Sequence, residues 1–495
     1  MIARLLHERL LVDPERPVLV DAGAGGGDRE ERIWSAGELD RVALRWARVL
    51  TGRRRVGLSA DNGLELAGAL LGALYAGAAV VPFHVGTPAL EVQARMQRFG
   101  VDCLLFCDEV FEATRELATW GTAPVEGDAP ALLLGTSGTT GEPRAVVITQ
   151  RGLAAHALSL VAATGLGPAD RVLAMLPLAH SYGCRMALIV PLLAGACVVL
   201  TRRFSAQRTL GLVAEQRITW APVVPTMLSA WVAVPASEIE VPSTLRWVLS
   251  AGAPLADALR VRAEARLGCE VREGYGLTEA SFSTLDAPPG ARTPGTVGQA
   301  VRGVEVRLAP ETQEVELRGD NVMAEYLDDA DATRAAFTED GWLRTGDIGA
   351  FDGAGNLRIV ERSKDIVLRG GHTIYPAEVE AVLARHPAVL AVAVVGREHA
   401  HLGEEVVAHV VMRKGWRWDE GVGVGEGEGV GAGVGAGAGE GAGRVLTEWS
   451  RQWLAPHKVP TQVVFQAELP LGPSGKVLKR RLRAGFGLPD EGSGG

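Results

Sequence analysis

The alternation of helical and strand patterns over the first two-thirds of the chain restricts its fold more than any other feature. Short apolar strand patterns, as at 172–176 and 245–250, alternate with helical patterns such as 206–216. Strands that alternate with helices form largely parallel sheets, because the helices cross back over the sheet faces. We therefore predict layered helices and sheets, an α/β fold, for this part of the chain.

The pattern changes to shorter units beyond about residue 362. Strand patterns at 366–368, 389–395 and 406–412 accompany a helical pattern at 376–385. Such a mixture is typical of a small α+β domain. Because 495 residues also exceed the length of one typical domain, we expect at least two domains.

Composition and charge exclude several classes of function. The formal net charge is −9, and the basic runs at 53–55 and 479–481 are not interleaved with aromatic residues, so we expect no nucleic-acid binding. The 5 cysteines are scattered without a CxxC pair, which argues against a disulfide framework or a zinc site. The charged N-terminal segment does not resemble a signal peptide, and we expect a cytoplasmic protein.

The uncharged run at 66–83 is long enough to suggest a membrane span. Three glycines interrupt the run, two valines precede Pro82, and Glu65 adjoins it without a flanking Lys/Arg cluster. These features favour a buried helix that leads into a buried strand. We expect no stable membrane insertion.

A low-complexity tract of Gly, Val, Ala and Glu lies at about 415–443. The tract has no periodic apolar face, and its glycines make ordering costly in conformational entropy. We predict a flexible Gly-rich insert before a helix at about 446–454, and we assign it no chemistry.

The segment LGTSGTTGEPR at 134–144 lies between an apolar strand pattern and a β-branched strand pattern at 145–149. Its glycines let the main chain approach a polyanion, and its N–H and O–H groups are suited to donate to phosphate oxygens. It is not a Walker A motif, because Pro143 and Arg144 follow the last glycine and a strand comes next. The segment predicts a triphosphate-binding loop, with an ordinary loop between strands as the alternative.

Five further motifs follow this loop in a fixed order. Each motif is short and weak alone, but their ordered combination is specific. The motifs are LPLAHSYG at 176–183, GYGLTE at 274–279, TGD at 345–347, ERSKD at 361–365 with glycines at 370–371, and PSGKV at 473–477.

With these motifs the chain closely resembles the adenylate-forming superfamily, which comprises acyl-CoA and aryl-CoA synthetases, carrier-loading adenylation domains and luciferases. The resemblance covers nearly the whole chain, from about residue 75 to the lysine motif at 473–477. It implies that a carboxylate attacks the α-phosphorus of ATP, that pyrophosphate leaves, and that an acyl-adenylate forms. The main task of such a site is to neutralise charge on phosphate.

The resemblance also implies which residues bind ATP. Arg144 replaces the usual lysine and keeps its positive charge. Asp347 suits the ribose hydroxyls because a carboxylate only accepts hydrogen bonds. Arg362 resembles the ribose-contacting arginine, although Glu361 stands where the family usually has glycine. The implied ATP-binding residues are Thr136, Ser137, Gly138, Thr139, Thr140, Gly141, Arg144, Gly274, Tyr275, Gly276, Asp347 and Arg362.

The same resemblance implies four catalytic residues, Lys476, His180, Thr278 and Glu279. Lys476 would bridge the carboxylate and the α-phosphate and stabilise charge where the new bond forms. Glu279 resembles the Mg²⁺ ligand of the family, and Mg²⁺ commonly takes one or two carboxylates together with waters and phosphate oxygens. His180 is interpreted as a gate beside the carboxylate, with a core histidine as the alternative.

Lys364 falls at the position where the resemblance implies a hinge. We predict a large N-terminal adenylate-forming domain at 1–361, a hinge at 362–364 and a smaller, mobile α+β domain at 365–495. The small domain would rotate between an adenylating and a thioester-forming arrangement, so that one pocket serves two reactions.

The loop at Gly370 and Gly371 is implied to line a tunnel for a pantetheine thiol. After rotation this loop would replace Lys476 at the site. Coenzyme A and the phosphopantetheine of a carrier protein present the same thiol, and both stay open as acceptors.

The resemblance places the substrate acid in a pocket with small walls. The amino-acid-activating branch has an aspartate where this chain has 179–182 without an acid, so an α-amino acid is disfavoured. Small residues leave room for an aromatic ring or a short-to-medium acyl chain, which stay open as alternatives. Beside His180 and Gly274, the implied pocket residues are Trp220, Val224, Ser250, Ala251, Gly252, Ala253 and Ser281.

The predicted function is ATP-dependent activation of a small carboxylic acid and its transfer to a thiol, as in an acyl-CoA or aryl-CoA ligase. One alternative is an adenylation enzyme that loads a carrier protein. Another is a non-catalytic adenylate-binding protein, and the presence of Glu279, Asp347 and Lys476 argues against it. The expected cofactors and co-substrates are ATP, Mg²⁺ and coenzyme A or phosphopantetheine.

Overall fold

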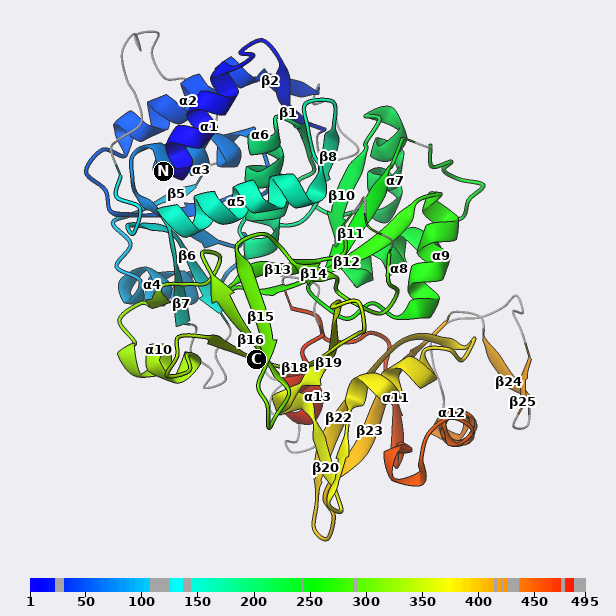
Figure 1. Cartoon of the computed structure of the whole chain (residues 1–495). Coiled ribbons are helices and arrows are strands. Elements are labelled where there is room, and N and C mark those ends of the chain that lie inside the picture. The colour runs from blue at the N-terminus through cyan, green and yellow to red at the C-terminus, as the bar shows by residue number, and fades with distance from the viewer. Residues whose placement is uncertain are drawn as a thin grey trace, which may run out of the picture.

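The computed structural model in Figure 1 describes most of the chain as two groups of sheets with their helices. The larger group runs from the N-terminus to Arg362, and the smaller one follows it. The residues described are 1–22, 31–106, 125–136, 144–242, 244–287, 290, 292–413, 416–419, 422–424, 436–472 and 477–484.

A nine-stranded sheet forms the largest layer of the N-terminal part. Its strands from β12 to β1 run parallel, and antiparallel strands close both edges. The order is β14 (Gln299–Ala300), β13 (Ser281–Leu285), β12 (Glu270–Leu277), β11 (Trp247–Ala251), β10 (Trp220–Val223), β8 (Arg171–Ala174), β9 (Cys197–Leu200), β1 (Pro17–Asp21) and β2 (Arg32–Ser35).

A six-stranded sheet forms the second layer. Two of its inner strands, β6 (Pro130–Thr136) and β7 (Arg144–Thr149), pair antiparallel, with Thr136 directly opposite Arg144 at the base of the predicted phosphate loop. The loop residues Ser137, Gly138, Thr139, Thr140 and Gly141 lie outside the described residues. The order is β17 (Glu325–Tyr326), β7 (Arg144–Thr149), β6 (Pro130–Thr136), β4 (Ala79–Phe83), β3 (Arg55–Ser59) and β5 (Cys103–Phe106).

Helices fill the space between these two sheets. Val80 and Leu132 share one buried core with the nine-stranded sheet, whereas the neighbouring Val81 and Leu133 face a second core under α4 (Ala89–Arg98). This period of two arises because successive side chains of a strand point to opposite faces. The helices in the shared core are α1 (Ile2–Leu11), α2 (Ala36–Val49), α3 (Leu64–Tyr75), α5 (Gln150–Thr164) and α6 (Val190–Ala194), the last preceded by a π-helical segment at Gly183–Ile189.

The outer face of the nine-stranded sheet carries three helices, seen at the right of Figure 1 beside β10, β11 and β12. They are α7 (Ala206–Glu215), α8 (Pro225–Ala233) and α9 (Asp257–Leu267). The layered α/β architecture predicted from the sequence is therefore confirmed.

The long uncharged run forms a buried helix and a buried strand, as predicted. α3 and β4 take up the run, and both belong to the buried cores of the N-terminal part. Within the described residues, no helix is long and apolar enough to cross a membrane.

An antiparallel four-stranded sheet completes the N-terminal part and ends at Arg362. Asp347 pairs with Arg362 across two of its strands. The sheet consists of β15 (Val304–Leu308), β16 (Glu314–Gly319), β18 (Leu343–Phe351) and β19 (Leu357–Arg362), and the helix α10 (Ala330–Ala336) precedes β18.

The C-terminal part has a sheet and cores of its own. One core lies under α11 (Pro376–Leu383) and α12 (Ala436–Arg451), and another lies under α13 (Lys479–Ala484). Neither core shares a residue with the N-terminal cores, which supports the predicted pair of a large and a smaller domain. The sheet contains β21 (His372–Ile374), β20 (Val367–Arg369), β23 (Gly403–Met412) and β22 (Val389–His399), with β26 (Gln462–Phe465) paired to β23.

The Gly-rich tract is less uniform than the sequence predicts. Its described residues include a hairpin of β24 (Arg417–Asp419) and β25 (Val422–Val424), and α12 begins at Ala436, well before the predicted end of the insert at 443. Alanine and glutamate between the glycines favour a helix, and the buried Ala442 and Leu446 supply the packing face that the glycines lack.

We expect Gly72→Ala to lower the free energy of unfolding by about 1–3 kcal/mol, because the core between α2 and α3 has no room for a methyl group. An added Cβ at Gly72 would lie 2.2 Å from the Cβ of Trp46 and 2.8 Å from the carbonyl oxygen of Ala43. Urea denaturation measures the change.

The matched control is Gly211→Ala in α7. Its nearest neighbour would be Glu215 Oε1 at 3.4 Å, so the helix should gain up to about 1 kcal/mol of stability. Equal stability of the Gly72→Ala variant and the wild type would contradict the close packing of α2 on α3.

Candidate active site

A cavity of about 720 Å³ opens where the parallel strands of both large sheets end. Its walls follow the carboxyl ends of β3 and β4 in one sheet and of β8 to β12 in the other. Ligands of open α/β sheets bind in crevices at this end of the strands, where loops present side chains and free backbone groups. The position of the cavity thus follows from the topology.

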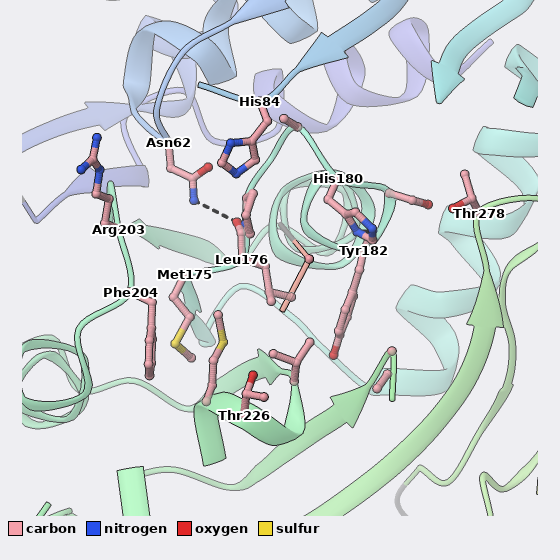
Figure 2. A pocket seen from close by; sticks show the side chains of 18 of the residues that line it. Asn62, His84, Met175, Leu176, His180, Tyr182, Arg203, Phe204, Thr226 and Thr278 are labelled. Atoms are coloured by element: carbon pink, nitrogen blue, oxygen red, sulfur yellow. Dashed lines mark hydrogen bonds between the residues drawn. The ribbon is translucent and has the colours of Figure 1, made fainter. Parts of the chain in front are cut away.

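The cavity gathers several of the residues predicted from the sequence. Figure 2 shows Arg203 and Phe204 at one end of the cavity and Thr278 at the other, with His180 and Tyr182 between them. Predicted residues that line it are His180, Val224, Ala251, Gly252, Gly276, Thr278 and Ser281, whereas Asn62, His84, Met175, Phe204, Thr226 and Met227 were not anticipated.

Other residues predicted for the acyl pocket lie in the strands behind the wall. Trp220 is fully buried, and its indole ring packs edge to face against that of Trp247, with the ring centroids 5.5 Å apart. Gly274 packs against Phe282, because a Cβ added at Gly274 would lie 2.7 Å from Phe282 Cε1. Ser250 is buried in β11. The described lining includes none of Trp220, Ser250, Gly274 and Ala253.

A buried amide holds the segment that carries His180. Asn62 donates a hydrogen bond of 2.9 Å to the carbonyl of Leu176, drawn in Figure 2, and accepts one of 2.8 Å from the backbone N–H of Leu178. The backbone N–H of Tyr182 donates to His180 Nδ1 at 3.3 Å. Because Nδ1 accepts this bond, Nε2 is the ring nitrogen that can donate a hydrogen bond.

The buried carboxylate of Asp347 forms the centre of the predicted ribose site. One oxygen accepts a hydrogen bond of 2.7 Å from the hydroxyl of Tyr275, and the other accepts one of 2.9 Å from Arg362 Nε. Burial raises the pKa of Tyr275 well above its ordinary value, and Asp347 adds to this rise, so the hydroxyl keeps its proton and donates. A carboxylate has about four acceptor positions, so Asp347 retains capacity for ribose hydroxyls.

A tyrosine that the sequence analysis did not single out connects the predicted phosphate and metal residues. Tyr326 donates a hydrogen bond of 2.9 Å to Glu279 Oε1, and the guanidinium of Arg144 lies 5.5 Å above the Tyr326 ring. Arg144 also contacts Asp329 at 3.4 Å. Burial raises the pKa of Tyr326, and Glu279 adds to the rise. The pairing of the short strand β17 with β7 brings these residues together, and no local sequence pattern predicts this pairing.

The half-buried Glu279 fits a Mg²⁺ ion that is held mainly by a nucleotide. The described residues contain no group of three or more His, Cys, Asp or Glu side chains able to hold a metal ion. Mg²⁺ often takes one or two carboxylates and completes its shell with phosphate oxygens and waters, so a single carboxylate suffices. Tyr326 leaves the second oxygen of Glu279 for such an ion.

The C-terminal domain reaches the cavity just before the predicted lysine motif. Leu471 and Gly472 line the cavity, and Leu471 pairs with Val477 in a β-bridge. The backbone N–H of Leu478 also donates a hydrogen bond of 2.8 Å to the carbonyl of Pro470. Lys476 lies outside the described residues, but both chain ends that flank it are fixed next to the cavity.

The predicted hinge and tunnel residues are exposed. Lys364 lies in a 3-10 turn at Ser363–Asp365. Gly370 and Gly371 form the tip between β20 and β21, with φ angles of 57° and 81°. Two successive left-handed residues are typical of a tight hairpin turn and favour glycine.

Two segments of the chain match described families. Residues 6–327 match the family described as AMP-binding enzyme, and residues 378–476 match the family described as AMP-binding enzyme C-terminal domain. The first match alone covers more than half of the chain. The chain belongs to the AMP-binding enzymes.

Several relatives of the chain are named as ligases of coenzyme A. The chain is 40% identical over 369 residues to a sulfoacetate–CoA ligase of Cupriavidus necator, covering 72% of this chain and 68% of that one. It is 32% identical over 484 residues to a feruloyl-CoA synthase of Amycolatopsis, covering 90% and 93%. The ATP-bound structure of MatB from Rhodopseudomonas palustris superposes with a TM-score of 0.83 at 27% identity, covering 98% and 99%.

These similarities confirm the superfamily, the two-part fold and the enzyme class predicted from the sequence. This AMP-binding enzyme is an acid–thiol ligase that uses ATP and coenzyme A.

We expect Tyr326→Phe to weaken Mg²⁺-dependent nucleotide binding about tenfold, because the Glu279 carboxylate loses a hydrogen bond. The phenylalanine ring still lies under Arg144, so Tyr326→Leu should weaken binding further. Calorimetry with ATP, with and without Mg²⁺, measures both effects. An equal loss in the absence of Mg²⁺ would contradict a role through Glu279.

Proposed function

We propose that this enzyme activates a small carboxylic acid, aromatic or short-to-medium acyl, and passes it to coenzyme A. One arrangement of residues supports this proposal most strongly. A cavity at the strand ends contains His180, and the segment that precedes Lys476 enters it from the other domain. An acid in this cavity would thus meet the ring N–H donor of His180 and the chain segment that leads to Lys476.

The lining supports an acid with a compact apolar body. Met175, Phe204, Met227 and Phe282 provide apolar wall, and the described lining has one carboxylate, Asp61, which lies 3.8 Å from Arg203. The relatives' names cover the same range of size, since they include sulfoacetate, ferulate and indoleacetate. An α-ammonium group finds no dedicated partner in this wall.

In the proposed first step, a carboxylate oxygen attacks the α-phosphorus of ATP, and pyrophosphate leaves. Lys476 neutralises charge between the two reacting groups, and Arg144 with the loop after Thr136 holds the phosphates. Tyr275, Asp347 and Arg362 hold the nucleoside. Glu279 would hold Mg²⁺, which would supply further neutralisation of the phosphate charge.

In the proposed second step, the thiol of coenzyme A attacks the acyl carbon, and AMP leaves with one oxygen of the original carboxylate. The thiol proton is lost, and a thioester forms. The hairpin at Gly370 and Gly371 would reach the site after the C-terminal domain turns about Lys364. Carrier-protein loading is the competing outcome for this step.

ATP–pyrophosphate exchange measured across a panel of aryl and aliphatic acids tests the first step. One group of acids should stimulate exchange, and coenzyme A should then yield the thioester. Exchange without thioester formation, followed by loading of a holo carrier protein, would overturn coenzyme A as the acceptor. An absence of exchange with every acid would overturn the proposed acid class.

We expect Lys476→Ala to lower adenylation by a factor of about 10² or more, because the charge at the reacting oxygens is lost. Thioester formation from a supplied acyl-adenylate should stay near the wild-type rate, since this lysine serves the first step only. Single-turnover assays separate the two half-reactions.

The control is Lys458→Ala, which removes a lysine of the same domain that forms a 2.7 Å ion pair with Glu378. This variant should leave both half-reactions unchanged. Equal losses in both half-reactions of Lys476→Ala would contradict a two-arrangement mechanism.

A further inference from the structure

Glu361 stands where the resemblance leads one to expect glycine, and its side chain crosses from one domain to the other. It is the penultimate residue of β19, next to Arg362, and its strand pairs with the one that carries Asp347. Its side chain nevertheless turns toward the C-terminal domain, where Oε2 accepts a hydrogen bond of 2.8 Å from the backbone N–H of Ala377.

This hydrogen bond caps a helix that has no cap of its own. α11 begins with Pro376, which lacks an N–H, and Tyr375 before it makes no capping hydrogen bond with its side chain. The first turn of a helix leaves N–H groups without intrahelical partners, and a carboxylate at this end also interacts favourably with the helix dipole. Glu361 therefore supplies, from the N-terminal domain, the hydrogen-bond acceptor that the first turn of α11 lacks.

A lysine balances the charge of this buried carboxylate. Glu361 is 8% exposed, and burial raises its pKa above the ordinary value, while the positive charge of Lys479 opposes the rise. Lys479 Nζ forms an ion pair of 2.9 Å with Glu380 of α11. The other oxygen of Glu361, Oε1, accepts a hydrogen bond of 3.0 Å from the backbone N–H of Arg362, whereas Ala377 and Lys479 belong to the C-terminal domain.

The same lysine lies close to the predicted catalytic segment in the chain. Lys479 begins α13, three residues after Lys476, and Val477 between them pairs with Leu471. At the other end of α13, Arg483 forms an ion pair of 2.9 Å with Asp365 beside the hinge turn. The helix that follows the lysine motif is thus tied at both ends to residues around the domain boundary.

We propose that Glu361 is a positioning residue for adenylation, which fastens the C-terminal domain to β19 in the orientation that brings Leu471 and Gly472 into the cavity. This inference rests on the proposed function. Glu361 touches none of the reacting groups in this role. It acts through α11 and α13, whose place decides where the segment before Lys476 lies.

The test compares the two half-reactions in Glu361→Gln and Glu361→Gly. The glutamine keeps one acceptor oxygen but loses the charge, and the glycine removes the cap entirely. ATP–pyrophosphate exchange should fall about threefold in the first and about tenfold or more in the second, as expected for loss of a charge-assisted hydrogen bond. Thioester formation from a supplied acyl-adenylate should stay within about twofold of the wild type.

The control is Glu38→Gln. Glu38 Oε2 accepts a hydrogen bond of 2.8 Å from the backbone of Ser35 in the capping box of α2, wholly inside the N-terminal domain. This variant also loses a carboxylate at the start of a helix and the stability that it provides. It tests whether such a loss alone changes the ratio of the adenylation rate to the rate of thioester formation. It should not.

Two outcomes would overturn the proposal: equal losses in both half-reactions, or unchanged exchange in a folded Glu361 variant. If Glu361→Gly fails to fold, Glu361→Gln carries the test. Failure of the wild type to exchange pyrophosphate with any acid would instead count against the proposed function.

Discussion

The buried charge of Asp347 is the constraint on which the junction of the molecule depends. A carboxylate that is 3% exposed is tolerated only when hydrogen bonds replace its lost hydration, and Tyr275 and Arg362 provide them at 2.7 and 2.9 Å. These partners come from β12 and β19, so one charged group joins the nine-stranded sheet to the four-stranded one. Arg362 is also the last residue of β19, so this interaction lies at the end of the larger group of sheets.

The cavity is a consequence of how two parallel sheets are oriented. In each sheet the carboxyl ends of the strands meet at one edge, and the two edges open toward a common space. Asn62 strengthens this meeting, because its amide reaches from the end of β3 to the segment after β8. The C-terminal domain closes the space with Leu471 and Gly472, so the site is complete only when both domains contribute.

The sequence predicts the layered fold, because hydrophobic periodicity and glycine-rich motifs are local signals. The sequence predicts the residues of the acyl pocket less well, since tertiary packing decides which side chains point into the cavity. Trp220 begins β10 and packs behind the wall, whereas Val224 lines the wall because it follows the carboxyl end of the same strand, where the cavity lies. Tyr326 lies 47 residues from Glu279 in the chain, and strand pairing alone brings them together. Asn62 and His84 lie within three residues of the ends of buried strands, and this position in the sequence could have identified them.

The cap that Glu361 provides also has a consequence for the order in which the protein assembles. During synthesis the larger domain emerges first, and β18 and β19 find their strand partners entirely within it. α11 emerges later, and its first free N–H has a partner only where β19 is already formed. The finished edge of one domain can thus serve as the starting point for the first helix of the next.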